Sequence, residues 1–176
     1  NQCTERVDNG GFEWISDWSI PWTNFTAGYS NFRYHSGARS MRTGIVYAAH
    51  NRYSYSDAYQ TVYIPSNSRS AWLTLWAYPT SSEPTSLALA DQPTAALVQT
   101  EALGSDVQYV LLLDSYGNWI DTLIWQRSNS QSWVKYSFDL SRYAGRTLRV
   151  QFGTYNDGWS GVTSMYVDDV SLVACP

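Results

Sequence analysis

The stretch SAWLTLWAY at residues 70–78 alternates between two kinds of side chain. Successive side chains of a β-strand point to opposite faces, so a period of two separates one set of residues from the other. The set that suits a core consists of Ala71, Leu73, Leu75 and Ala77, and the opposite set consists of Trp72, Thr74, Trp76 and Tyr78. This stretch therefore predicts a strand with one face in a hydrophobic core and an aromatic face turned outward.

The same alternation recurs along the chain, whereas helical periodicity is nearly absent. It predicts strands at residues 57–64, 106–114, 118–125, 132–138, 146–155 and 163–173, with weaker candidates at 39–47 and near 12–15. Turn signals separate these strands. Two examples are the hairpin turn that contains Gly117 and a compact turn at residues 139–145. Eight or more short strands with such turns indicate an all-β, antiparallel sandwich or barrel.

One segment interrupts this rhythm. Residues 79–105 contain Pro79, Pro84 and Pro93 among serine, threonine and alanine, and they are too many for an ordinary connection. Two interpretations stay open, a lid over a site and a mobile insertion. The length of 176 residues otherwise suits a single domain over residues 1–176.

The two cysteines, Cys3 and Cys175, stand close to the two ends of the chain. A disulfide brings its two Cα atoms within roughly 4.4–6.8 Å of each other, so pairing would place the first and last segments side by side. The alternative is two buried free thiols. We expect the disulfide, and with it a secreted or cell-surface protein.

The composition excludes several classes of protein. A net charge of −4 argues against binding a nucleic acid by phosphate neutralisation. The chain has no apolar run of about 18 residues, so no membrane span is expected, and its start lacks the pattern of a signal peptide. The chain is rich in aromatic side chains, with 14 tyrosines, nine tryptophans and five phenylalanines.

Signatures of catalysis are missing from the sequence. Its two histidines form no zinc-binding pair, and there is no Gly-x-Ser-x-Gly nucleophile motif. The four glutamates do not form the alternating carboxylates that a jelly-roll glycosidase tends to use. We therefore expect a protein that is not an enzyme.

Asp168 and Asp169 lie side by side inside an apolar strand, where carboxylates are costly unless they are paired. Either one of them points inward or the strand bulges. Calcium would satisfy them, with Glu13 adding charge and the turn at residues 36–39 adding carbonyl oxygens. The alternative is that the carboxylates pair with arginine or cap backbone amides.

Three motifs carry a resemblance to a known group of proteins. They are NGGFE at residues 9–13, HSGARSMR at 35–42 and YVDDVSL at 166–172. Together they resemble the jelly-roll carbohydrate-binding modules of the galactose-binding-like superfamily, and residues 133–172 resemble accessory domains of secreted bacterial enzymes, including peptidases. The resemblance spans most of the chain outside residues 79–105 and implies a sandwich with adjacent termini.

The resemblance also implies a structural calcium ion, but it says little about the ligand. By position, the ion would be held by Glu13, Ser36, the Arg39 carbonyl and Asp168 or Asp169. The terminal cysteines are not part of the family pattern.

Strand parity suggests where a ligand would bind. Parity predicts that the outward sets of three strands form one surface of aromatic and hydrogen-bonding side chains, which suits a sugar. The predicted binding residues are Trp72, Trp76, Tyr78, Trp119, Trp125, Arg149, Gln151 and Tyr155, together with Trp159 in a loop. The structural alternative is that these rings stabilise the sheet or pack beneath loops. The loops at residues 47–59 and 155–161 offer a second possible binding site.

The sequence thus predicts a non-catalytic, monomeric module that binds carbohydrate and directs an attached secreted enzyme to a polysaccharide or glycan. The alternative partner is a neighbouring domain of a larger secreted protein. In that case the chain would be a protein-interaction or structural domain of a peptidase or surface protein.

Overall fold

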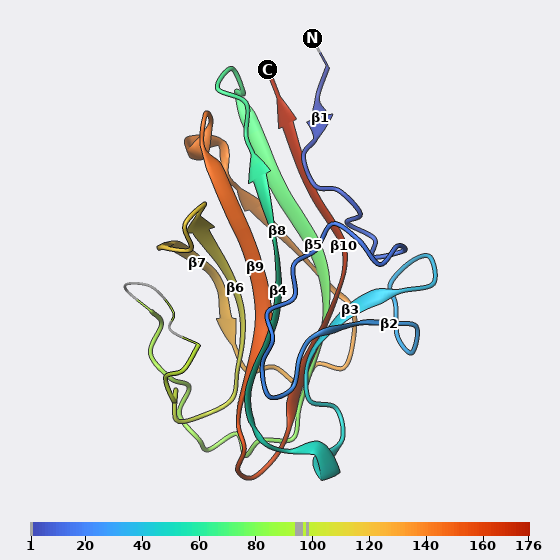
Figure 1. Cartoon of the computed structure of the whole chain (residues 1–176), viewed down its shortest axis with the longest axis vertical. Coiled ribbons are helices and arrows are strands. Elements are labelled where there is room, and N and C mark those ends of the chain that lie inside the picture. The colour runs from blue at the N-terminus through green and yellow to red at the C-terminus, as the bar shows by residue number, and fades with distance from the viewer. Residues whose placement is uncertain (1, 94–96, 98) are drawn as a thin grey trace.

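Two antiparallel sheets pack face to face in the computed structural model, which describes residues 2–93, 97 and 99–176. The result is a jelly-roll β-sandwich, and both termini lie together at one end of it (Figure 1). The predicted all-β antiparallel sandwich with adjacent termini is therefore confirmed. None of the described helices has the length and hydropathy that crossing a membrane requires.

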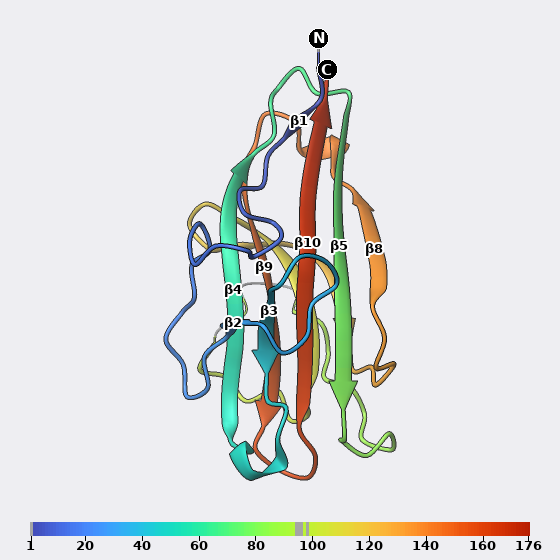
Figure 2. The same ribbon diagram turned by 90° about the vertical axis from the view of Figure 1, so that its right-hand side faces the viewer.

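The strands divide unequally between the sheets, as Figure 2 shows from the side of the first sheet. The first sheet has the order β2 (Gly28–Ser30), β3 (Ser40–Gly44), β10 (Thr163–Cys175), β5 (Ser70–Ser81) and β8 (Val134–Asp139), and β1 (Thr4–Glu5) also pairs with β10. The second sheet has the order β4 (Tyr53–Tyr63), β9 (Thr147–Asp157), β6 (Val107–Asp114) and β7 (Trp119–Gln126). Two single-turn 3-10 helices, η1 (Ala48–His50) and η2 (Ser141–Tyr143), lie in connections.

All but one of the predicted strands are present, with ends displaced by a few residues. The exception is the candidate near residues 12–15, which is wrong. The Phe12 N–H donates to the Asn9 carbonyl at 3.1 Å, and Phe12 has a φ of 57°, so the chain turns there. The short strands β1 and β2 were not predicted, because two or three residues show no period.

Parity identified the core correctly on β5 and β9. Ala71, Leu73, Leu75 and Ala77 are fully buried between the sheets, as are Leu148 and Phe152. On β7 parity was partly wrong, because the pairing of β6 with β7 shifts register twice. Leu123 alternates in phase with Trp119 and Trp125, which parity placed on the outward face, yet it packs against the core, and the Trp119 indole donates to the Thr122 hydroxyl at 2.9 Å on the outer side.

The expected disulfide is confirmed. Cys3 and Cys175 are bonded, with their Cα atoms 4.1 Å apart. The bond closes the same edge at which β1 pairs with β10, where Thr4 stands opposite Ala174. The disulfide and the short ladder therefore hold the two ends of the chain together.

The described residues between β5 and β6 form no strand, and they lie across the outer face of the second sheet. There Ala90, Leu97 and Leu103 pack on a second apolar cluster that includes Tyr109 and Tyr155. The Trp125 indole donates to the Ala90 carbonyl at 2.6 Å, and the Leu103 N–H donates to the Tyr155 hydroxyl at 3.1 Å. The described part of this connection, residues 82–93, 97 and 99–106, is called the covering segment below.

Candidate functional site: an edge groove and an acidic seam

The predicted single binding surface does not exist, because its residues belong to both sheets. Trp72, Trp76 and Tyr78 lie on β5 in the first sheet, whereas β7 and β9 belong to the second. The outward faces of the two layers of a sandwich point away from each other. Parity tells which side of a strand faces the core, but not which sheet the strand joins.

On the first sheet the rings are largely covered by the loop between β2 and β3. His35 stacks on Trp76 with ring centroids 3.9 Å apart, and the Arg33 guanidinium lies 3.9 Å from the centre of the Tyr78 ring. Only Trp72 keeps a large exposed fraction, 46%. Two of the three predicted rings on this sheet therefore pack against the loop, and of these three only Trp72 is largely free to contact a ligand.

On the second sheet the predicted residues lie beneath the covering segment or at its border. Tyr155 and Gln151 are buried, and Trp119 and Trp125 pack against the second apolar cluster. Arg149 is half-buried and lies over the Tyr59 ring at 4.1 Å. Trp159 stands apart, exposed in the turn between β9 and β10.

A different surface collects exposed aromatic side chains, along the edge strand β4. Residues 19–26 run beside this strand, as the blue chain next to β4 in Figure 2 shows. Ser19 pairs with Tyr59, the Asn24 amide donates to the Tyr53 carbonyl at 3.1 Å, and the Phe25 N–H donates to the Ser54 hydroxyl at 2.7 Å. These contacts hold Trp22 at the surface with 94% of its area exposed.

Four cavities follow one another along this edge, and each shares lining residues with the next. Their volumes are about 280, 280, 360 and 180 Å³. Phe25 and Arg42 are common to the first two, residues 22–24 to the second and third, and Gln99 to the third and fourth. We call this row of neighbouring cavities the edge groove.

Both ends of the edge groove carry fixed hydrogen-bonding groups. At one end, the Arg42 guanidinium donates to the Thr26 carbonyl at 3.0 Å and lies 5.0 Å from the centre of the Phe25 ring. Burial lowers the pKa of Arg42. At the other end, the fourth cavity is lined by Gln99, Arg149 and Gln151.

Asp57 anchors that second end. Its Oδ2 accepts hydrogen bonds from the Tyr109 hydroxyl at 2.7 Å, from the Gln151 amide at 2.9 Å and from the Gln99 amide. Burial raises the pKa of this carboxyl group, and the three hydrogen bonds lower it in part. The contact with Gln99 fixes the covering segment to the second sheet and shapes the groove wall.

Of the predicted ligand-binding residues, only Arg149 and Gln151 line the edge groove. Sequence reasoning missed Trp22, Phe25 and Arg42. The available signal was the run IPWTNF at residues 20–25, in which two rings and an asparagine follow a proline outside any predicted strand.

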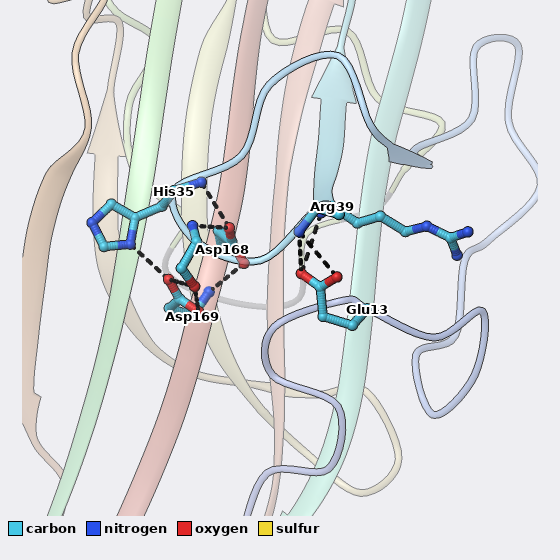
Figure 3. Close-up of polar contacts among 7 residues, drawn as sticks. Glu13, His35, Arg39, Asp168 and Asp169 are labelled. Carbon is cyan, nitrogen blue, oxygen red and sulfur yellow. Dashed lines mark hydrogen bonds and ion pairs between the residues drawn. The ribbon is translucent and has the colours of Figure 1, made fainter.

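The five predicted metal-binding residues lie close together at a second location, the acidic seam (Figure 3). Of the two alternatives, an inward-pointing carboxylate or a bulge, the strand shows the bulge, between Asp168 and Ser171, where Asp169 has a φ of 49°; Asp168 is also fully buried. Asp168 Oδ2 accepts the N–H groups of His35 and Ser36 at 2.8 and 3.2 Å. Asp169 contacts the His35 ring at 2.6 Å and the Ser36 hydroxyl at 2.7 Å.

Glu13 meets the other end of the same loop. Its carboxylate accepts the Ala38 N–H at 2.9 Å and the Arg39 N–H at 3.2 Å (Figure 3). Gly10 supports this arrangement, because a Cβ there would lie 1.8 Å from the Val170 carbonyl oxygen. The motif at residues 9–13 thus needs glycine for a close backbone approach.

The carboxylates of the acidic seam therefore have hydrogen-bond donors of the 35–39 loop as partners, as in the amide-capping alternative. Burial, the largest cause, raises the pKa of Asp168 to about 6, although the three amides that donate to it lower the pKa. Calcium binding by Glu13, Ser36, Arg39, Asp168 and Asp169 stays a prediction.

Comparisons with known proteins agree on the fold. No protein-family model matches the chain, and no curated protein matches its sequence. Among solved structures, a CBM61 module in complex with β-1,4-galactotriose is 10% identical, with a TM-score of 0.59 over 96% of this chain and 97% of that one. The K3 cleaved adhesin domain of Lys-gingipain from Porphyromonas gingivalis W83 is 15% identical, with a TM-score of 0.57 over 98% and 99%.

The enzymatically active domain of tailspike protein 4 from bacteriophage CBA120 is 14% identical, with a TM-score of 0.57 over 97% of this chain. The chain spans only 21% of that protein's length. These similarities place the chain in the jelly-roll class that carbohydrate-binding modules share with other domains.

Proposed function

We propose that this protein is a non-catalytic carbohydrate-binding module that holds a glycan chain in the edge groove. The observation that carries the proposal is a row of four neighbouring cavities along one edge of the sandwich, with exposed or half-exposed rings beside them. An extended depression fits a chain-like ligand better than a compact one. Sugars present C–H faces that stack on rings and hydroxyls that bind to amide, carboxylate and guanidinium groups, and the groove supplies rings, amides and guanidinium groups.

The fold supports the same function. A CBM61 module with a similar sandwich was solved with β-1,4-galactotriose, and a CBM22 module of Clostridium thermocellum Xyn10B, with a TM-score of 0.53, binds its ligand in a cleft. The disulfide suits an oxidising environment, so we place the module in a secreted or surface protein. There it would keep an attached enzyme near its polysaccharide.

Replacing Trp22 by alanine is expected to weaken glycan binding by about 1–3 kcal/mol, the range for a nucleic-acid base stacked on an aromatic ring. The ring is almost fully exposed and contributes to two of the four cavities, so its loss removes stacking area without opening the core. Affinity gel electrophoresis against soluble xylan, β-1,4-galactan and mannan, with pull-down on insoluble cellulose, measures the effect.

Two further variants identify the binding surface. Trp72→Ala removes the exposed ring of the first sheet, and Trp14→Ala removes an exposed ring outside the groove, so both should bind like the parent protein. A loss confined to Trp72→Ala would move the site to the first sheet. Retention on none of the glycans would contradict the proposal and favour a protein-interaction domain.

A further inference from the structure

Three carboxylates meet at the end of the sandwich opposite the termini, where β5 and β9 end and β6 begins (Figure 1). Glu83 follows β5, Asp106 precedes β6 and Asp157 is the last residue of β9. Each offers an oxygen within 4.8 Å of the others. We call these three residues the acidic triad, and it is separate from the acidic seam and from the edge groove.

Glu83 is the unusual member of the acidic triad. Only 6% of the residue is exposed, and both carboxylate oxygens are buried without a hydrogen-bond partner among the described residues. Burial, followed by the charge of Asp157, raises the pKa of Glu83, whereas the nearby backbone amides of Asp106 and Gly161 and the Arg127 guanidinium lower it in part. Burying a carboxylate without a hydrogen-bond or ionic partner costs free energy. A partner from outside the chain would therefore stabilise Glu83.

The neighbouring groups do not remove this deficit. Asp106 accepts the Asp157 N–H at 2.9 Å and the Thr163 hydroxyl at 2.7 Å, and Asp157 accepts the Trp159 N–H at 2.9 Å. The Arg127 guanidinium attracts the Glu83 carboxylate, but its Nη2 donates to the Pro84 and Leu87 carbonyls and its Nη1 has no hydrogen-bond partner among the described residues. Among the described residues, the ion pairs are His35 with Asp169 and Arg142 with Asp121, so none involves the triad.

We propose that the acidic triad binds a calcium ion. The donor set consists of carboxylate oxygens without histidine or cysteine, which suits a hard divalent cation rather than zinc or copper. The ion would supply the missing partner of Glu83 and neutralise carboxylates that otherwise repel one another.

The positions of the ligands give this ion a defined mechanical role. Glu83 and Asp106 stand at the two ends of the covering segment, and Asp157 begins the turn between β9 and β10. A bound cation would tie the start and the end of the segment to each other and to that turn. Because Gln99 of this segment lines the edge groove, calcium would also stabilise one groove wall. This last consequence alone rests on the proposed function.

The test uses the full chain, freed of metal by chelation and titrated with Ca²⁺ by isothermal calorimetry, with the melting temperature as a second readout. Glu83→Gln is expected to lose one binding event that the parent protein shows. Glu101→Gln is the matched control, because Glu101 is an exposed glutamate of the same segment and should bind calcium like the parent protein. Glu13→Gln, in the acidic seam, should retain the triad event.

The melting temperatures distinguish loss of a site from loss of the fold. Without calcium, Glu83→Gln should melt at or above the parent protein, because it removes a buried, unpartnered charge. With saturating calcium it should melt below the parent protein, because only the parent gains from the ion. An unchanged isotherm for Glu83→Gln, a parent protein that binds no Ca²⁺, or a binding event lost only in Glu13→Gln would overturn the proposal. Glycan retention is not a readout here, so a failure of the proposed function leaves this test intact.

Discussion

Replacing both Cys3 and Cys175 by alanine is expected to lower the free energy of unfolding by about 5 kcal/mol. The disulfide joins residues 172 positions apart, and in the chain-entropy account the stabilisation grows with the length of the closed loop. The structure adds a local reason, because β1 has only two residues and its pairing with β10 depends on a tether. Equilibrium urea denaturation at neutral pH measures the difference.

The control for this experiment is reduction of the disulfide. A reducing agent should destabilise the parent protein by a similar amount and leave the double alanine variant unchanged. A double variant that unfolds at the same urea concentration as the parent protein would show that pairing of the end strands alone holds the termini.

Replacing Phe152 by alanine is expected to cost about 3–5 kcal/mol of stability, the range for removing a large ring from a packed core. Phe152 is fully buried on β9 and joins the sandwich to the N-terminal segment. Its ring centre lies 5.3 Å from that of Trp18 and 6.0 Å from that of Phe12. The cavity would open where these three rings meet, and urea denaturation reports the loss.

Phe32→Ala is the matched control for this variant, because the same ring is removed from a largely exposed position. Its stability should stay within about 0.5 kcal/mol of that of the parent protein. Similar losses in both variants would contradict the assignment of Phe152 to a tightly packed core.

Much of the fold was predictable because its signals are local. The alternation of residues on β5 and β9 identified the core residues Leu73, Val150 and Phe152. In each of these strands every second side chain faces the core, so the sequence of the strand alone shows which side is buried. The adjacent aspartates on β10 predicted either an inward-pointing carboxylate or a bulge; the strand bulges, and Asp168 is also fully buried. The failures occur where the period is interrupted, at the turn around Phe12 and at the shifted register around Leu123.

The candidate site was less predictable. Tyr155 and Trp125 have the composition of a binding platform, but the covering segment buries the first and packs against the second. A segment without periodicity gives no signal of where it will pack. Trp22 and Gln99 are 77 positions apart in sequence, and only the fold makes them line the same cavity.

The order of residues along this chain determined its longer strands and the core faces of β5 and β9, because both depend on neighbours in sequence. It also predicted the pairing of the two cysteines, because the chain has only these two. The tertiary structure decides which sheet each strand joins, which rings remain exposed, and how residues distant in sequence form the edge groove and the acidic triad. Those outcomes depend on contacts across the sandwich, which strand periodicity does not encode.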